Sequence, residues 1–461
     1  MDSLWPLLSA FFPPVLTPSY LRALLPPVVE TLGLAAGSMF LAFLISLPLG
    51  IAAGLRLPGT RPLLAVLSAV RAIPDLTVAI LCVILFGVGP GAGLLALAIY
   101  YGAVVAKMFA DILRTAPRPP LEALAATGAR RLQLALFGLL PLKRADLLTY
   151  GAYEFESALR ASIVVGAVGG GGLGSELVGS LAALDFPRVT TQLIVLVTVV
   201  AVLDQLAVWL RRHPRWLLAL APLGLAALAA YAPRLLAFDH ALHVFGEMFP
   251  PRLTERDWAA LLPRLWETAW MALAGTGGAV LAAALFGALT ARNLAPPWLA
   301  WPLRRLMEVL RSIPEVVWGL ILIAVAGVGP TAGAAALGLH SAGCLARLFA
   351  ESLENAPRAP QLAIAGTGAS AVVVTAWATV PLALGPVAVH SLFRLEWNLR
   401  MATVMGLIGA GGIGQALYDA QQLFFYRQMM AYILITWVLV ALVDNASEAL
   451  RRRYKLNQIP A

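Results

Sequence analysis

The sequence predicts an all-α protein that crosses a lipid bilayer many times and consists of two copies of one helical unit. Three observations support this fold class: an apolar composition, long apolar runs and an internal repeat. Hydrophobic residues make up 60% of the 461 residues and charged residues 12%, against about 45–50% and about 25% in soluble domains. A chain with a mean hydropathy of +0.83 cannot cover its surface with polar groups, so lipid has to be its solvent. This composition excludes a soluble enzyme, a nucleic-acid reader and a disordered protein.

Apolar runs that can cross a membrane occur eleven times. A transmembrane helix needs about 20 mostly apolar residues. The predicted spans are residues 28–54, 63–87, 92–113, 145–167, 190–210, 215–236, 265–291, 306–327, 331–350, 383–407 and 428–450. Pro74 and Pro314 are expected to kink or shorten the spans that they enter, because proline removes a helical hydrogen bond.

Basic residues gather in every second loop. The net charge of +9 comes from short basic clusters between apolar runs, which is typical of the cytoplasmic loops of a membrane protein rather than of a nucleic-acid-binding surface. These clusters follow the first, third, fifth, seventh and last predicted spans. By the positive-inside rule we therefore expect the N-terminus outside and the C-terminus in the cytoplasm.

The chain repeats itself in register. Arg71-Ala-Ile-Pro74-Asp75 returns as Arg311-Ser-Ile-Pro314-Glu315, 240 residues later. Gly87-Val-Gly-Pro90 returns as Gly327-Val-Gly-Pro330 at the same offset. Upstream, Glu30-Thr31 pairs with Glu267-Thr268 at an offset of 237. Chance does not supply this many matches in one register, so the chain is a tandem duplication.

Each copy holds five predicted spans, and an odd number would invert the second copy in the membrane. The extra apolar run at 215–236 has no counterpart in the first copy and restores its orientation. We expect a first repeat over residues 1–213, a linking span and outer linker over 214–262, and a second repeat over 263–461. The arrangement resembles a homodimer fused into one chain, with a pathway expected between the halves.

The loop after the third span carries a more specific pattern. Pro119-Pro120-Leu121-Glu122-Ala123 is followed by Gly128 and then by Leu140-Pro141. The prolines and the first-turn acid suit the start of a short helix, and an ordinary amphipathic connector is one interpretation. The spacing also resembles the EAA loop of ABC importer permeases. That resemblance implies a type I permease fold, and coupling helices within about 115–141 and 355–381 that dock on a cytoplasmic ATPase dimer.

The resemblance assigns the ATPase contacts to a short set of residues. They are Glu122, Ala123, Gly128, Arg130, Arg131, Ala363 and Gly368. The second loop has Leu362, Ser370 and Ala371 where the first has Glu122, Arg130 and Arg131. We therefore expect the second coupling helix to dock by apolar contact and the first by charge-assisted bonds.

A longer resemblance begins at Tyr153-Glu154-Phe155-Glu156-Ser157-Ala158-Leu159-Arg160 and continues into a glycine-rich stretch, and both parts recur 240 residues later. This pattern resembles the phosphonate- and phosphite-type permeases. It implies the membrane part of an ATP-driven importer for a small oxyanion, located in the bacterial cytoplasmic membrane and supplied by a periplasmic or lipid-anchored solute-binding protein. Methionine and glycine-betaine permeases share parts of the pattern and remain alternatives. An ion-coupled secondary transporter is the alternative from another class.

The predicted pathway or gate consists of two acid–base pairs and six glycines. They are Glu156, Arg160, Gly169, Gly171, Gly174, Glu396, Arg400, Gly409, Gly411 and Gly414. Glu156 and Arg160, like their copies, lie one helical turn apart and can pair, so they either guide an anion or only hold helices together. The glycines either form a gate or allow a tight re-entrant turn. They also fit G-x-G-x-x-G, but no βαβ pattern surrounds them, which argues against a nucleotide site.

Several site types have no support in the sequence. No lysine lies in a G-x-x-x-x-G-K-[ST] loop, so we expect the chain not to hydrolyse ATP and a separate subunit to supply the energy. His240 and His243 can bind a metal in principle, but we interpret them as solvated and predict no metal, no cofactor and no nucleic-acid partner. Cys82 and Cys344 lie in apolar runs and are interpreted as core residues.

Overall fold

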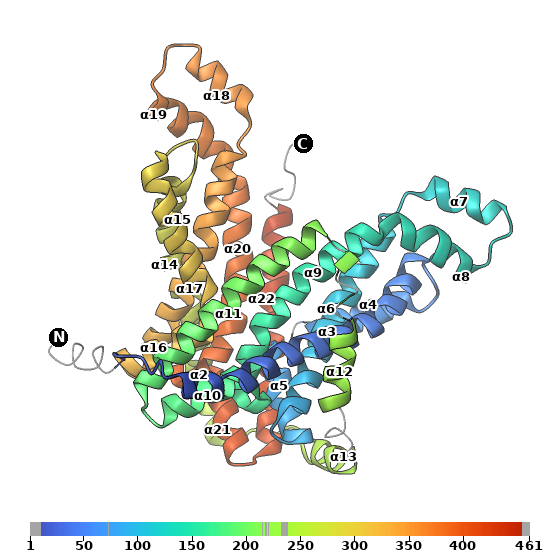
Figure 1. Cartoon of the computed structure of the whole chain (residues 1–461), viewed down its shortest axis with the longest axis vertical. Coiled ribbons are helices and arrows are strands. Elements are labelled where there is room, and N and C mark those ends of the chain that lie inside the picture. The colour runs from blue at the N-terminus through green and yellow to red at the C-terminus, as the bar shows by residue number, and fades with distance from the viewer. Residues whose placement is uncertain are drawn as a thin grey trace. The chain divides into compact units, whose positions relative to one another are not determined.

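The computed structural model describes residues 11–71, 73–213, 215–216, 219, 221–231 and 238–453, and within them the side chains of residues 61, 182, 204, 207, 211 and 238–240 also lie outside the description. Every regular element in the described ranges is a helix, which confirms the all-α prediction (Figure 1). The chain divides into two compact units, Met1–Glu247 and Met248–Ala461.

The first unit is organised around α3 and α6, which pack along most of their length. Its helices, including the π-helical turns η1 and η2, are α2 (Pro18–Ala23), α3 (Leu25–Gly54), α4 (Thr60–Arg71), α5 (Asp75–Phe86), α6 (Pro90–Arg114), α7 (Arg118–Ala126), α8 (Arg131–Gln133), η1 (Leu134–Leu139), α9 (Leu140–Val165), η2 (Gly166–Gly170), α10 (Gly172–Ala182), α11 (Phe186–Arg212), α12 (Ala221–Tyr231) and α13 (Phe238–Glu247).

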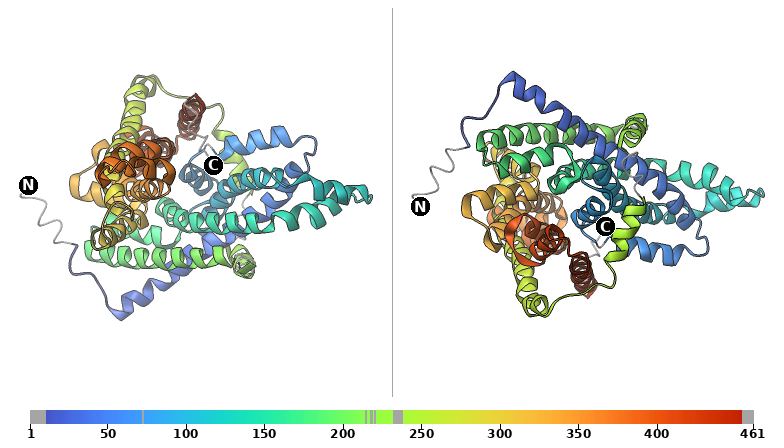
Figure 2. Two further views of the ribbon diagram at one scale, coloured as in Figure 1. Left: turned by 90° about the horizontal axis from the view of Figure 1, so that it is seen from above. Right: turned by 90° about the horizontal axis from the view of Figure 1, so that it is seen from below.

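The second unit repeats this plan around α14 and α17. Its helices are α14 (Glu255–Thr290), α15 (Pro297–Ser312), α16 (Glu315–Ala326), α17 (Pro330–Glu354), α18 (Arg358–Ala365), α19 (Ala371–Val374), η5 (Thr375–Thr379), α20 (Val380–Met405), η6 (Gly406–Ala410), α21 (Gly412–Gln422) and α22 (Tyr426–Arg453). The long helices α14, α17 and α20 run side by side in Figure 1 and are seen nearly end-on in Figure 2.

The helix boundaries of the two units reflect the duplication. α17 begins and ends 240 residues after α6, and the same offset relates α20 to α9 and α21 to α10. The packing between the central helices also repeats. A Cβ on Gly50 of α3 would come within 2.8 Å of the Cβ of Phe109, and a Cβ on Gly287 of α14 would come equally close to that of Phe349. Glycine at these two positions therefore allows the close helix–helix approach that is usual in membranes.

Seven helices in the described ranges are long and apolar enough to cross a membrane, and three bent helix pairs raise this number to ten. All ten overlap predicted spans. The prolines act as predicted: α4 and α5 meet at 90° before Pro74, and α15 and α16 meet at 88° before Pro314. Ile313 takes an extended conformation, with φ −83° and ψ 120°, as expected for a residue that precedes proline. Residues 63–87 and 306–327 are thus broken spans and not straight ones.

The predicted eleventh span, 215–236, is described only in part. Its described helix is α12, which has 11 residues and measures about 16 Å at 1.5 Å per residue. A bilayer core is about 30 Å thick. α12 packs against α3, and residues 232–237 lie outside the described ranges. A complete crossing at this position stays a prediction.

Candidate coupling and pathway site

The predicted coupling helices are two short helices with no buried residue, each at the end of a unit (Figure 1). α7 ends where Gly128 adopts φ +83° and its N–H donates to the carbonyl of Ala125 at 2.9 Å. α18 ends where Gly368 adopts φ +81° and its N–H donates to Ala365 at 3.0 Å. Nothing lies within 4 Å of a Cβ built on either glycine. Residues other than glycine are therefore disfavoured at these two positions by the left-handed backbone conformation and not by a lack of space.

The side chains predicted to meet an ATPase are available for contact. Glu122, Ala123, Arg130 and Arg131 are exposed in the first unit, and Ala363 is exposed in the second. Leu362, at the position of Glu122, leaves 69% of its surface exposed. A leucine this exposed at the tip of a hairpin provides an apolar contact, whereas Glu122 provides a charged one.

One long helix connects each predicted coupling hairpin, that is α7 or α18 with the turn that follows it, to the glycine-rich stretch. In the second unit this helix covers Ala371–Ala410 and has 40 residues, which gives about 60 Å at 1.5 Å per residue. In the first unit it covers Arg131–Gly170, after which the chain bends by 55° into α10. Each predicted coupling helix is thus joined to its glycine bend by one long helix, which has a π-helical stretch near its start and ends in a kink at Gly169 or Gly409.

The glycines form this bend and pack tightly within it. Gly169 and Gly171 have φ values of +96° and +86°, and Gly409 and Gly411 have +102° and +92°. A Cβ on Gly174 would collide with the carbonyl oxygen of Ile163, and one on Gly414 would collide with that of Thr403. A Cβ would have an atom at 3.0 Å or closer at five of the six positions, and Gly409 is the exception, with its nearest atom on Val328 at 3.6 Å. A gating role stays a prediction.

The repeated Glu-Thr pair supports the bend from a neighbouring helix. Thr31 Oγ1 accepts from the N–H of Leu173 at 2.9 Å, and Thr268 Oγ1 accepts from that of Ile413 at 3.0 Å. Glu267 also accepts from the N–H of Gly412 at 2.8 Å. These bonds satisfy N–H groups that the first turn of α10 and α21 leaves without a helical partner.

The acid–base pairs are arranged differently from the prediction in the second unit. Glu156 and Arg160 pair as expected, with 2.8 Å between Oε1 and Nη2. Glu396 and Arg400 do not pair with each other: Glu396 bonds to Arg451, and Arg400 lies 2.5 Å from Asp444. The expected pair is wrong because α22 runs alongside α20 and offers a partner of opposite charge to each residue. The counterparts of Arg451 and Asp444 in the first unit are residues 211 and 204, whose side chains lie outside the description.

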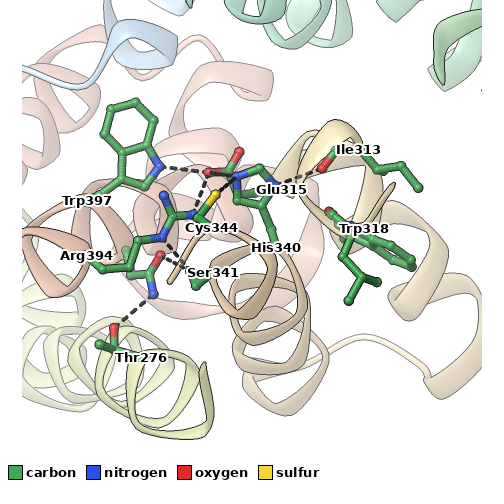
Figure 3. Close-up of polar contacts among 11 residues, drawn as sticks. Thr276, Ile313, Glu315, Trp318, His340, Ser341, Cys344, Arg394 and Trp397 are labelled. Carbon is green, nitrogen blue, oxygen red and sulfur yellow. Dashed lines mark hydrogen bonds and ion pairs between the residues drawn. The ribbon is translucent and has the colours of Figure 1, made fainter. Parts of the chain in front are cut away.

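The structure adds a buried polar cluster that sequence reasoning did not assemble (Figure 3). Glu315, at the start of α16, is 7% exposed. Its Oε1 lies 3.2 Å from Arg394 Nη2 and accepts from Trp397 Nε1 at 2.7 Å. The same oxygen lies 3.2 Å from His340 Nε2. A second row of bonds continues from Arg394 to Ser341 and through Asn398 to Thr276. We call Glu315, His340, Arg394 and Trp397 the Glu315 cluster.

The imidazole of His340 has three polar neighbours. Its Nδ1 lies 2.9 Å from the carbonyl oxygen of Ile313, and its Nε2 lies near the Glu315 carboxylate and 3.5 Å from Cys344 Sγ. The carbonyl and the carboxylate accept hydrogen bonds, whereas a thiol can also donate one. The cluster thus holds one buried acid against the guanidinium of Arg394 and the imidazole of His340.

The first unit has a different set of residues at these positions. At an offset of 240, Asp75 and Glu154 stand in place of Glu315 and Arg394, and Tyr100 stands in place of His340. Glu154 is 6% exposed and accepts from the hydroxyl of Tyr150. The first unit thus has two acids where the second has an acid and an arginine. A search for charged residues inside predicted spans finds these positions in the sequence, but no local pattern indicates which of them meet.

Comparison with known proteins identifies the family. The sequence pattern of the family described as "Binding-protein-dependent transport system inner membrane component" matches residues 46–216 and again residues 283–456. The chain belongs to this family. The two matches begin 237 residues apart and end 240 residues apart, which are the offsets of the internal repeat. The family match thus confirms the duplication of a type I permease unit that the sequence predicted.

Several curated proteins are similar over long stretches. The chain is 30% identical over 480 aligned positions to the phosphate-import permease protein PhnE of Mycolicibacterium smegmatis, covering 98% of this chain and 89% of that protein. It is 37% identical to the phosphite transport system permease protein PtxC of Stutzerimonas stutzeri, covering 46% of this chain and 76% of that protein. A putative phosphite permease, HtxC, of the same organism is 32% identical over 49% of this chain and 77% of its own length.

Family membership fixes the general role of the chain. It is an inner-membrane subunit of an ABC transporter and not an enzyme, and it works with a separate ATPase and a substrate-binding protein. The described ranges contain no group of three or more His, Cys, Asp or Glu side chains that suits a metal ion. The side chain of His240 lies outside the description.

Proposed function

We propose that this chain is the fused permease of an ATP-driven importer for a phosphorus oxyanion of the phosphate, phosphite or phosphonate class. The observation that carries the proposal is the similarity over 98% of the chain to a phosphate-import permease, together with the phosphite permeases that match about half of it. A cytoplasmic ATPase dimer would drive transport, and a periplasmic or lipid-anchored binding protein would deliver the anion.

The coupling step follows from the helix that joins hairpin and bend. Closure of the ATPases would push α7 and α18, and the continuous helices behind them would carry this movement to the glycine bends. Each bend has backbone conformations that only glycine adopts easily and would serve as the outer gate. Two discrete arrangements of such packed helices give outward- and inward-facing states.

The charged side chains support an anionic cargo. Arg160 keeps 28% of its side-chain surface exposed, whereas Arg400 keeps 14% and is held by Asp444. Both arginines are ion-paired, and the greater exposure of Arg160 makes it the better candidate to attract an anion. Exchanging Glu156 and Arg160 preserves their pair and moves the positive charge by one helical turn. If the exchanged protein transports normally, Arg160 has only a structural role.

We further propose the predicted domain division and orientation. Residues 1–213 and 263–461 would be two permease repeats with the same orientation, joined by the linking span and outer linker of residues 214–262, with the C-terminus in the cytoplasm. A cysteine introduced at Ser370 should react with a membrane-impermeant maleimide only from the cytoplasmic side. Reaction from the outer side would contradict this topology.

The deciding experiment is transport by the reconstituted system. The chain, its ATPase and its binding protein are placed in proteoliposomes, and uptake of radiolabelled phosphate, phosphite, methylphosphonate, methionine and glycine betaine is measured with and without ATP. We expect ATP-dependent uptake of one of the phosphorus compounds and no ATPase activity of the chain alone. Uptake by the chain alone, driven by an ion gradient, would support a secondary transporter instead. ATP-dependent uptake of only methionine or glycine betaine would contradict the oxyanion assignment.

A further inference from the structure

The first unit contains a large apolar cavity. Its volume is about 1000 Å³, and it is lined by residues of α3, α9 and the end of α11, together with Arg215 and Ala221. Its walls are mainly the apolar side chains of α3 from Ala36 to Leu47 and of α9 from Leu140 to Phe155. This volume is at the upper end of the roughly 300–1000 Å³ of small-molecule sites, so the cavity accommodates a long apolar molecule.

Three arginines also line this cavity. Arg144 lies in the second turn of α9, Arg212 ends α11, and Arg215 follows. His213 lies beside them, and no acidic side chain is among the described residues that line the cavity. An apolar cavity with an unbalanced set of arginines matches a ligand that has an apolar body and an anionic head.

The arginines lie at one end of the apolar walls. Arg144 and Phe155 are 11 residues apart on α9, and Leu47 and Ala36 are 11 residues apart on α3, which corresponds to about 16 Å along each helix. A Cβ on Gly54, the last residue of α3, would lie 3.0 Å from Leu139, just before α9. The end of α3 therefore adjoins the start of α9, and Arg144 is at the Leu47 end.

The length of the cavity fits one leaflet of a bilayer. Half of a hydrocarbon core of about 30 Å is about 15 Å, close to the extent of the apolar walls. The arginines are at the end that the positive-inside rule assigns to the cytoplasm, where anionic lipids give the membrane surface a negative potential. We infer that this cavity binds one anionic phospholipid, with its acyl chains along α3 and α9 and its phosphate at Arg144, Arg212 and Arg215.

The second unit lacks one of the three arginines. At an offset of 240 residues, Leu384 stands in place of Arg144, whereas Arg452 and Lys455 correspond to Arg212 and Arg215. Basic pockets between transmembrane helices on the cytoplasmic side are a known way to hold anionic headgroups. The inference concerns a lipid and is independent of the transported substrate.

The test is a count of retained lipids on the full chain. The protein is reconstituted in nanodiscs of equal parts phosphatidylglycerol and phosphatidylcholine, and the lipids that remain after transfer to detergent are identified by native mass spectrometry. We expect one phosphatidylglycerol to remain on the wild-type protein. Arg144→Leu copies the residue of the second unit and should lower this occupancy about fivefold, the factor for about 1 kcal/mol per basic residue. Arg144→Leu with Arg212→Leu should lower it about 25-fold.

Two further variants separate the headgroup from the cavity. Leu44→Trp fills the apolar part without changing charge and should reduce retention of phosphatidylglycerol. Arg292→Leu removes an arginine of the second unit that is not among the residues lining this cavity, and should leave retention unchanged. The inference is overturned if the wild-type protein retains no phospholipid, if phosphatidylcholine is retained as well as phosphatidylglycerol, or if Arg144→Leu and Arg292→Leu have the same effect.

Discussion

Replacing Glu315 by Gln should destabilise the second unit more than any loss of an exposed charge. The Glu315 carboxylate is 7% exposed and faces Arg394, Trp397 and His340 through a single oxygen. Glutamine keeps the shape of the side chain and one acceptor oxygen but removes the negative charge. Arg394 is then a positive group in an apolar segment without the carboxylate that compensates it.

The expected cost follows from the loss of that compensation. Removing one partner of a buried ion pair costs about 3–5 kcal/mol, because the remaining charge is left buried. Arg394→Met should cost less than Glu315→Gln, since it leaves the Glu315 carboxylate in contact with His340 and bonded to Trp397. Glu315→Gln combined with Arg394→Met should recover part of the loss, because residues in contact are energetically coupled.

The assay is thermal unfolding of the purified chain in nanodiscs, followed by tryptophan fluorescence. The matched control is Arg452→Met, which removes one member of an exposed pair with Glu448 whose side chains are 74% and 49% exposed. Exposed pairs of this spacing contribute about 0.3–0.5 kcal/mol, so the control should unfold at nearly the wild-type temperature. If Glu315→Gln shifts unfolding no further than Arg452→Met, or if the double variant is as unstable as the sum of the single ones, the cluster is not ionised as described.

Three further outcomes are expected from the coupling hairpins and glycine bends. Gly174→Ala should destabilise the chain by about 1–3 kcal/mol through overpacking. Gly179 lies in the same helix but has open space around it, so Gly179→Ala should be neutral or stabilising. Thermal unfolding of the two variants compares these effects. Glu122→Ala should lower transport-coupled ATP hydrolysis about tenfold, because it removes one charge-assisted bond of roughly 1.5 kcal/mol. Equal losses for Glu122→Ala and Leu362→Ala would contradict unequal docking of the two coupling helices. At Gly128, where only the backbone is restrictive, Asn should retain more ATPase coupling than Val, because Asn tolerates a left-handed conformation.

The fold followed from the sequence because its main features are periodic or local. Apolar runs located ten spans, and the breaks at Pro74 and Pro314 followed from the geometry of the residue before proline. The 240-residue offset came from letter matches alone and reappears in the boundaries of α6 and α17. The short helices α7 and α18 were found in the same way, since their prolines and glycines are tied to specific backbone conformations, and their coupling role stays a prediction.

The pathway residues were harder to predict because their partners come from distant parts of the chain. Glu396 and Arg400 are one helical turn apart, and this spacing suggested a pair. The sequence does not show how α22 packs against α20, and this packing pairs Glu396 with Arg451 and Arg400 with Asp444. The Glu315 cluster brings together residues up to 82 positions apart, so only the packing of α16, α17 and α20 could reveal it.

Fusion of the two repeats explains how a feature can be present in one repeat and absent from the other. In a homodimer every residue occurs twice, so a substitution that suits one copy changes both. In this chain, several positions related by the 240-residue offset differ in charge, among them Glu122 and Leu362, Arg144 and Leu384, and Glu154 and Arg394. These three pairs lie at separate places, namely the predicted coupling helices, the apolar cavity of the first unit and the Glu315 cluster. A covalent link allows such differences, because a substitution in one half leaves the other half unchanged, and the two halves are therefore not interchangeable.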